Sequence, residues 1–320
     1  MNRTIKGLII FGALVSLVYL LPLEALAEKR IGVFIWSEEP RYYESQNGIM
    51  DQLRKEGFGE PAVKYTVENA RGSKAKAAEL VQKFTTAKMD LIFTIGTHAT
   101  LAAVKAIKDV PIVFSTVYDP VEAGIARDWK SSGNNTTGAC TRIPMTKVVN
   151  SLKGFAPIKR LAVLYTPGEK NSEAQLLELQ KIQADSRITV IPVALTTKQE
   201  VVQILPEVIR SVDTLYLTGS SIVGATVPTI VDAANKEKVV TISHLDDLVA
   251  KGALLGVCVD SYLVGALAGK KAVKILKGAK PSSIPIETEK KLDIILNRKS
   301  AKAGQFQIPP SFMKSVTKVV

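Results

Sequence analysis

Short apolar runs rich in β-branched residues alternate with amphipathic stretches along most of this chain, and this alternation constrains the fold more than any other feature. The runs predict strands at residues 31–36, 91–95, 112–115, 161–165, 189–193, 214–217 and 239–242. Between them, apolar residues recur at spacings of three and four, which predicts helices at residues 44–56, 74–87, 97–107, 172–184, 198–209 and 222–236. Strand–helix–strand units of this length form parallel sheets with right-handed crossovers and helices on both faces. The predicted fold class is therefore α/β.

The alternation runs through the chain twice, which suggests two lobes. One series covers about residues 30–125, and the second begins near Arg160, after the loop-type cluster at residues 131–135. The pattern continues with a strand at 252–259, a long helix at 262–277, a turn at 280–283 and a last strand at 292–296. With 320 residues, the chain exceeds the usual size of a single core. Two Rossmann-like lobes with parallel sheets, joined by segments that pass between them, are the simplest interpretation.

The first residues have the three parts of a secretory signal. Arg3 and Lys6 give a basic start, residues 8–21 are almost wholly apolar, and Ala25-Leu26-Ala27 has the small residues that a signal peptidase recognises. We therefore expect residues 1–27 to be a signal peptide cleaved after Ala27, with the protein exported to the periplasm. The alternative is an uncleaved N-terminal helix that anchors the chain in the membrane.

Charge and cysteine content exclude several classes of protein. The formal net charge is +12, but the lysines are scattered over predicted helix faces and no basic run carries interleaved aromatic residues, so we expect no nucleic-acid partner. Cys140 and Cys258 form a disulfide or remain buried free thiols; the sequence leaves both open. These cysteines, His98 and His244 lack the close spacing of metal ligands, so no metal or other cofactor is expected.

Ligands of open parallel sheets bind outside the carboxyl ends of the strands, so the loops that follow predicted strands are the candidate site. The residues selected from these loops are Trp36, Ser37, Gly96, Thr97, Tyr118, Asp119, Asn171, Ser172, Gly219, Ser220 and Asp260.

These residues offer chemistry suited to a zwitterion. Gly96-Thr97 and Asn171-Ser172 stand at predicted helix starts, where free N–H groups favour a carboxylate, although Thr97 and Ser172 also suit plain N-caps. Asp119 and Asp260 suit an ammonium group or sugar hydroxyls, or alternatively a cap or a hinge hydrogen bond. Aromatic residues complete the set: Trp36, Tyr42 and Tyr118 suit stacking on an apolar ligand, with core packing the alternative for Trp36. An amino acid or similar small solute is therefore expected.

An enzymatic role is the weaker hypothesis. His98 lies in a candidate site loop, and Cys140 or a serine could act as its nucleophile, as in a hydrolase or isomerase. The sequence has no G-x-S-x-G, no Walker glycine loop and no G-x-G-x-x-G. We therefore expect a binding protein and no catalytic residues.

Several segments together resemble the ABC transporter substrate-binding family that includes tryptophan- and tyrosine-type binding proteins. They are residues 90–124 (DLIFTIGTHATLAAVKAIKDVPIVFSTVYDPVEAG), 133–139 (GNNTTGA), 160–175 (RLAVLYTPGEKNSEAQ), 252–278 (GALLGVCVDSYLVGALAGKKAVKILKG) and 284–313 (IPIETEKKLDIILNRKSAKAGQFQIPPSFM). The resemblance implies a type I periplasmic-binding fold with three segments crossing between the lobes, near Ile143, Lys251 and Ser283. One lobe would comprise residues 28–143 and 252–283, and the other 144–251 and 284–320. Cys140 and Cys258 would then lie near the hinge.

The same resemblance implies a function and a set of contacts. Matching motifs carry the family's ligand contacts to Thr97, Asp119, Asn171-Ser172 and Asp260. Two cleft loops depart from the family pattern, because Trp36 to Arg41 lacks the usual His-Pro pair and Thr218 to Ser221 lacks an acidic residue. The expectation is a monomeric receptor that binds an amino acid, aromatic or branched, and docks on the membrane permease of an ABC uptake system. A sensing module of a signalling partner is the alternative within binding proteins.

Overall fold

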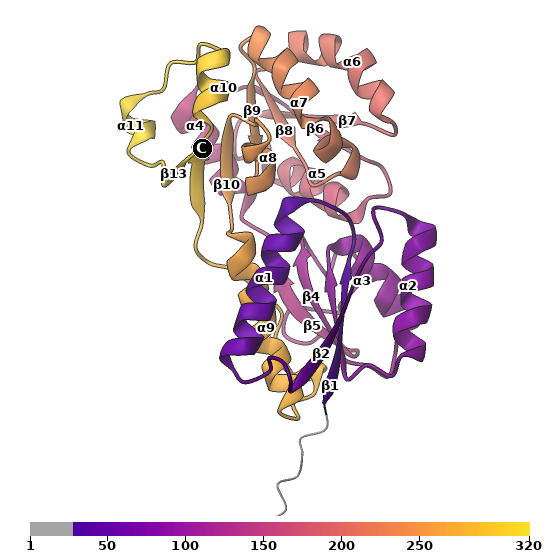
Figure 1. The fold of residues 1–320 in the computed structure, drawn as a ribbon. Coiled ribbons are helices and arrows are strands. Elements are labelled where there is room, and N and C mark those ends of the chain that lie inside the picture. The colour runs from indigo at the N-terminus through magenta and orange to yellow at the C-terminus, as the bar shows by residue number, and fades with distance from the viewer. Residues whose placement is uncertain (1–27) are drawn as a thin grey trace, which may run out of the picture.

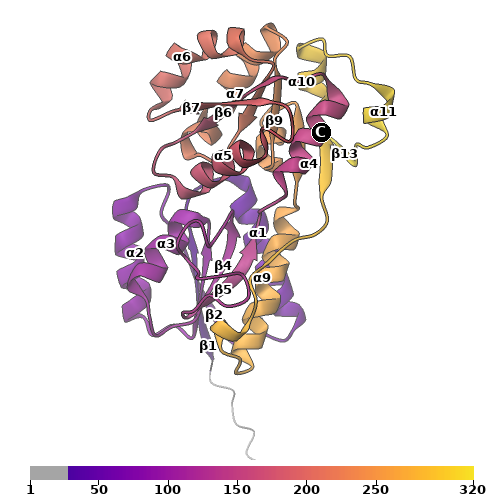
Figure 2. The same ribbon diagram turned by 180° about the vertical axis from the view of Figure 1, so that it is seen from behind.

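The computed structural model describes residues 28–320, which form two lobes, each built on one sheet with helices on both faces (Figure 1, Figure 2). The predicted signal peptide, residues 1–27, lies outside the described residues. No helix within residues 28–320 is both long enough and apolar enough to cross a membrane.

The first lobe contains a six-stranded sheet whose strand order is β11-β5-β4-β3-β1-β2, with every pair parallel. Its strands are β1 (Lys29–Ile35), β2 (Val63–Asn69), β3 (Leu91–Ile95), β4 (Ile112–Val117), β5 (Thr136–Cys140) and β11 (Glu287–Thr288). Its helices are α1 (Pro40–Lys55), α2 (Lys74–Thr86), α3 (Thr97–Ala106) and α9 (Ser261–Leu276), with the 3-10 turn η1 (Pro281–Ser283). Helices α1 and α9 cover one face of the sheet, and α2 and α3 cover the other.

The second lobe contains a seven-stranded sheet of order β13-β12-β10-β9-β8-β6-β7, in which only the β10–β12 pair is antiparallel. Its strands are β6 (Arg160–Tyr165), β7 (Thr189–Ala194), β8 (Thr214–Leu217), β9 (Val240–Ser243), β10 (Leu255–Cys258), β12 (Asp293–Leu296) and β13 (Lys318–Val319). Its helices are α4 (Met145–Phe155), α5 (Lys170–Ile182), α6 (Lys198–Ser211), α7 (Ser221–Lys236), α8 (Asp246–Ala250), α10 (Arg298–Ala303) and α11 (Pro310–Met313).

Three segments cross between the lobes, and two of them lie later in the chain than the sequence suggested. The first connects β5 to α4 and includes Ile143, as expected. Strand β10 belongs to the second sheet, so the next crossing follows Cys258 instead of lying near Lys251. Strand β11 pairs with β5 in the first sheet, so the last crossing follows Thr288 instead of Ser283. The expected boundaries at residues 252 and 283 therefore assigned one strand to the wrong lobe in each case.

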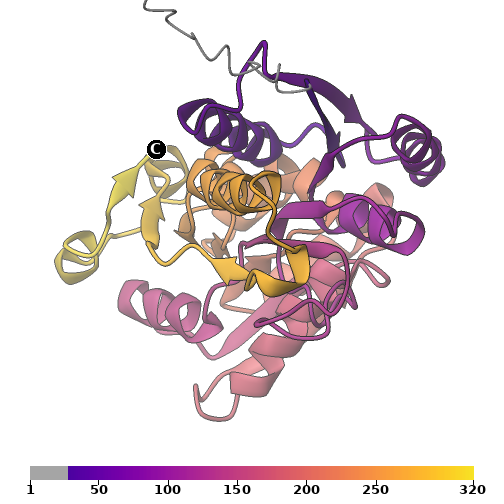
Figure 3. The ribbon, with the colours of Figure 1, turned by 90° about the horizontal axis from the view of Figure 1, so that it is seen from below.

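Two glycines allow α1 and α9 to lie against each other along the outside of the first sheet (Figure 3). A Cβ atom on Gly48 would lie 2.0 Å from the backbone oxygen of Tyr262, and one on Gly265 would lie 1.9 Å from that of Ser45. Only a residue without a side chain fits at either position. Helix α9 follows α1 only after the chain has passed through the second lobe, so this contact packs the returning segment of the first lobe against its first helix.

The elements that the sequence pattern missed are strands β2, β5, β11 and β13 and helices α4, α8, α10 and α11. Strand β2 is an edge strand with a largely half-exposed face, and β5 is short and built from small residues, so neither has an apolar run. Helix α4 follows directly after a crossing segment and Pro144.

Candidate functional site

The carboxyl ends of the central strands of both sheets meet at a cavity between the lobes. It is lined by the segments after β1, β3 and β4 on one side and after β6, β8 and β9 on the other: Arg41, Tyr42, Thr97, His98, Thr116, Tyr118, Thr141, Asn171, Gln175, Gly219, Ser221, His244 and Leu245. Its volume is about 20 Å³, room for a water molecule and far too little for an amino acid. An amino acid therefore fits between these walls only when the lobes lie further apart than in this structure.

Aromatic rings form the wall contributed by the first lobe. The Trp36 ring stacks on the His98 ring, with centroids 4.6 Å apart and planes 17° apart. Gly96 has a φ of 98°, and a Cβ atom there would lie 3.1 Å from the Tyr42 ring, so glycine lets the start of α3 approach these rings. The Trp36 Nε1 atom is buried without a hydrogen-bond partner in the described part of the chain.

Thr116, in the same wall, combines backbone strain with an unpaired hydroxyl group. Its φ is 58°, a left-handed conformation that β-branched residues rarely adopt, and the register of β4 against β5 shifts between Phe114 and Val117. Its Oγ1 atom is buried and has no partner among residues 28–320. Strained residues of this kind concentrate at ligand-binding sites.

The wall contributed by the second lobe is a set of connected amides on α5 and the β8–α7 loop. Asn171 donates from Nδ2 to the Gly219 carbonyl at 2.6 Å, and the Gly219 N–H donates to Gln175 Oε1 at 3.1 Å. These bonds fix the orientation of Asn171, whose Oδ1 atom is buried and unpaired within the described residues. Asn171 Oδ1 is therefore an acceptor held in place beside the cavity.

His244 lies at the back of the cavity as a neutral ring. Its Nδ1 atom is 2.9 Å from the Tyr216 hydroxyl, and its ring meets the edge of Tyr118, with centroids 5.1 Å apart. Burial, assisted by the Arg41 charge, lowers the pKa of His244 to about 3. Burial also lowers the pKa of His98 to about 4, so both histidines present uncharged rings to a solute at neutral pH.

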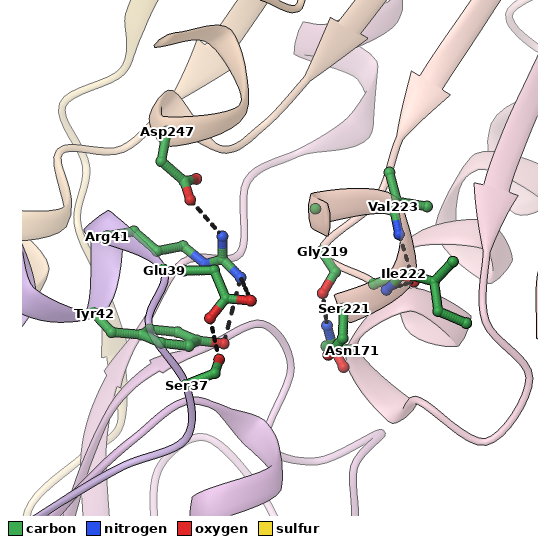
Figure 4. A network of polar contacts seen from close by, with 12 residues as sticks. Ser37, Glu39, Arg41, Tyr42, Asn171, Gly219, Ser221, Ile222, Val223 and Asp247 are labelled. Carbon is green, nitrogen blue, oxygen red and sulfur yellow. Dashed lines mark hydrogen bonds and ion pairs between the residues drawn. The ribbon is translucent and has the colours of Figure 1, made fainter. Parts of the chain in front are cut away.

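A buried ion pair joins the lobes beside the cavity (Figure 4). Arg41 Nη1 on α1 donates to Asp247 Oδ2 on α8 at 2.6 Å, and the two residues are 4% and 6% exposed. Burial opposes the charge of Arg41, but Asp247, Tyr42 and Glu39 outweigh it, so the pKa of Arg41 lies above its ordinary value.

A second polar connection between the lobes lies at the first crossing segment. The Tyr118 hydroxyl donates to Glu178 Oε2 on α5 at 2.6 Å, and Arg142 Nε donates to Glu178 Oε1 at 2.5 Å. Arg142 also pairs with Asp119 at 3.0 Å. The lobes are thus held together by charge on both sides of the cavity.

Four of the residues selected from the sequence line the cavity, and two more lie directly behind it. Thr97, Tyr118, Asn171 and Gly219 are lining residues, whereas Trp36 and Gly96 support the first wall. The remaining five do not line it: Ser37, Asp119, Ser172, Ser220 and Asp260.

These five side chains are engaged within the protein. Asp119 accepts from the N–H groups of Val121 and Glu122 and pairs with Arg142. Asp260 and Ser220 are the N-caps of α9 and α7. Ser172 bonds to the backbone of Thr166 and Glu169, and Ser37 bonds to Glu39. In this structure both aspartates make the capping or hinge contacts of the alternative, and neither lines the cavity.

The sequence selection missed lining residues inside regular elements or a crossing segment, including Arg41, Thr116, Thr141 and Gln175. Gln175 had a usable signal, because it lies four residues after Asn171 and so on the same helix face. Arg41 also lay in an inspected segment, the loop between the strand predicted at 31–36 and the helix predicted at 44–56, but it was not selected; in the structure it stands in the first turn of α1, which begins at Pro40.

Two lobes with a cavity lined by fixed polar groups between them are the architecture of a solute-binding protein. The chain matches the family model described as ABC transporter substrate binding protein over residues 30–320, and it belongs to that family, whose members are binding receptors and not enzymes. It is 28% identical to the tyrosine-binding protein of Clostridioides difficile strain R20291 over 282 residues, 88% of this chain and 82% of that protein.

Two solved structures share the fold of this chain. The structure of an ABC domain in complex with L-Trp from Streptococcus pneumonia has a TM-score of 0.87 and 27% identity, covering 92% of this chain and 100% of that one. The ligand-free, open structure of a substrate-binding protein with adhesive properties from Clostridium difficile has a TM-score of 0.74 and 30% identity, covering 91% and 99%. The fold is that of the type I periplasmic-binding proteins. The TM-score is higher against the L-Trp complex than against the ligand-free, open structure.

Residues 28–320 contain no group of three or more His, Cys, Asp or Glu side chains suited to a metal ion. Cys140 and Cys258 are buried free cysteines, and burial raises the pKa of both thiols.

Proposed function

We propose that this ABC transporter solute-binding protein takes up an aromatic amino acid in the cleft between its lobes. It works outside the cytoplasm, as proteins of this class do, and as a monomer passes its solute to a membrane permease. The observation that carries the proposal is the coincidence, at one interlobe cavity, of aromatic rings with two buried polar atoms that lack partners in the described chain: Thr116 Oγ1 and Asn171 Oδ1.

Unpaired buried polar atoms are costly, at about 1–3 kcal/mol each, unless another molecule satisfies them. Asn171 Oδ1 accepts and so suits the ammonium group of an amino acid. The first N–H groups of α3, beginning at Thr97, have no acceptor within the helix and suit its carboxylate. The neutral rings of Tyr42, Tyr118, His98 and His244 suit an aromatic side chain. The tyrosine-binding relative and the L-Trp complex support the same solute class.

Closure follows from contacts that both lobes make to the same solute. Only a solute that binds the closed form better than the open form can shift the equilibrium between them. The cavity has walls from both lobes, so a solute bridging them meets this condition. The closed receptor then presents both lobes together to the permease.

A thermal-shift screen tests the proposal. Residues 28–320, unfolded and refolded to remove bound solute, are heated with each amino acid, with sugars, nucleosides and small carboxylates. Solute at one hundred times its Kd stabilises the native state by about 2.7 kcal/mol. We expect L-Trp, L-Tyr or L-Phe to raise the Tm, and sugars and nucleosides to leave it unchanged. A shift with sugars alone would refute the proposed solute class.

A further inference from the structure

A second groove between the lobes, distinct from the solute cavity, carries an excess of carboxylates. It has a volume of about 360 Å³, and its charged lining residues are Glu44, Asp246, Asp247, Asp260, Arg41 and Lys318. Four carboxylates face two cations, which leaves two negative charges uncompensated. The chain as a whole carries +12, so this groove departs from the general charge of the molecule.

One of these carboxylates is buried with an unpaired oxygen. Asp247 is 6% exposed, and its Oδ2 atom holds Arg41 at 2.6 Å. Its Oδ1 atom has no hydrogen-bond partner among residues 28–320, although it belongs to a residue in the groove wall. A buried carboxylate oxygen without a donor is costly, and a donor that reached it from the groove would lower that cost.

The neighbouring Asp246 is also under-compensated, because the favourable charge of Lys318 is outweighed by burial and by the nearby carboxylates. Burial, together with the charges of Asp247 and Asp260, raises the pKa of Asp246 to about 6. Its Oδ1 atom accepts from the Asp247 N–H at 2.9 Å and from Ser261 Oγ at 3.3 Å. These donors are neutral, so they leave the local excess of negative charge in place.

The groove spans the junction that must close on solute. Glu44 and Arg41 lie on α1 in the first lobe, Asp246 and Asp247 on α8 in the second, and Asp260 on the crossing segment between β10 and α9. A cation bound here contacts both lobes, and the separation of the lobes would break its contacts.

We propose that this groove binds a small organic dication of the alkyl diamine class, and that binding favours the closed form. Two ammonium groups match the two uncompensated charges, and the volume lies within the range of small-molecule sites. The described residues do not form a metal-type cluster, which favours an organic cation over a divalent metal ion. The two binding equilibria are then thermodynamically linked. The diamine raises the affinity for solute by the same factor by which solute raises the affinity for the diamine. The proposal does not depend on which solute the main cavity takes.

The test is calorimetric titration of residues 28–320 with 1,4-diaminobutane. The key variant is Asp260→Asn, because asparagine caps α9 as well as aspartate does and removes only the charge. The matched control is Asp232→Asn, which removes an exposed carboxylate on α7 that pairs with Lys236. We expect diamine binding to weaken about tenfold or more in Asp260→Asn, as for the loss of a charge-assisted contact, and to be unchanged in Asp232→Asn.

Three outcomes would overturn the proposal. The first is no binding at about 10 mM diamine, which is ten times a weak Kd of about 1 mM. The second is equal affinity of the wild type and Asp260→Asn for the diamine. The third is an equal response to calcium chloride, which would indicate metal binding, or to sodium chloride of the same ionic strength, which would indicate charge screening. Butylamine, with one ammonium group, should bind more weakly than the diamine, and equal affinity would argue against a dication site.

Discussion

Arg41 on α1 and Asp247 on α8 form an ion pair of 2.6 Å that is buried between the lobes. One partner comes from each lobe, so the pair exists only when the lobes are closed. Closure of this receptor therefore rests on a charge contact of the protein itself, to which solute contacts are added.

Replacement of Arg41 by methionine should weaken solute binding. Removal of one partner of a buried pair costs about 3–5 kcal/mol, because the other charge stays buried and uncompensated. Lobe opening returns Asp247 to water, so the cost appears as a more open protein and a Kd raised about a hundredfold or more. Small-angle scattering and calorimetry measure the two effects.

Two further variants separate this effect from a lost solute contact. Arg54→Met breaks an exposed pair with Asp51 and should change little. Arg41→Met combined with Asp247→Leu removes both charges and should recover part of the lost affinity. No recovery would mean that Arg41 acts by touching the solute.

Asn171→Ala should reduce solute affinity with little change in fold stability. It removes the Oδ1 acceptor beside the cavity and the bond to the Gly219 carbonyl. We expect a loss of about 1.5–3 kcal/mol for a bond to a charged ammonium group. The exposed Asn150→Ala on α4 is the matched control. Equal affinities of the two variants, measured by calorimetry, would remove Asn171 from the site.

The strand and helix pattern predicted the α/β fold because buried strands and amphipathic helices leave local marks in the sequence. The site was predicted only in part, for a different reason. Position after a strand identified Thr97, Tyr118, Asn171 and Gly219, but it could not separate a side chain that faces the solute from one that caps a helix, as with Asp260. Partners distant in the chain decide that, such as Arg142 for Asp119 or Asp247 for Arg41.

Gly265→Ala should destabilise the first lobe. The added Cβ atom would lie 1.9 Å from the Ser45 carbonyl oxygen, so α1 and α9 must move apart, and overpacking of this kind costs about 1–3 kcal/mol or more. Gly224→Ala on α7 is the control, since its Cβ would lie 3.9 Å from the nearest atom and alanine favours helix by about 1 kcal/mol. Urea unfolding measures both. A neutral Gly265→Ala would contradict the close packing of these helices.

A fall in pH should lower the free energy of unfolding because of His244. Its native pKa of about 3 lies below the ordinary 6.5, so the unfolded chain binds the proton first. The free energy of unfolding is therefore unaffected by His244 above pH 6.5 and falls as the pH drops from 6.5 toward 3, by roughly 5 kcal/mol in all. His244→Gln should lose less stability between pH 7.5 and 4.5 than the wild type does, as measured by urea unfolding.

Asp246 should raise the free energy of unfolding as the pH falls, opposite to His244, over an overlapping range of pH. Its native pKa of about 6 lies above the ordinary 3.8, so the native state binds the proton first and gains stability as the pH falls through 6 toward 3.8. Asp246→Asn removes this gain and should lose more stability than the wild type over the same range. A loss equal to that of His244→Gln would contradict both assignments.

The most direct test of the central claim is calorimetric titration of refolded residues 28–320 with L-Trp, L-Tyr and L-Phe, alongside Asn171→Ala. Saturable binding of an aromatic amino acid at one site, weakened in Asn171→Ala, is the predicted result. Absence of binding by all three, in a protein shown to be folded, would contradict an aromatic amino acid as the solute of this cleft.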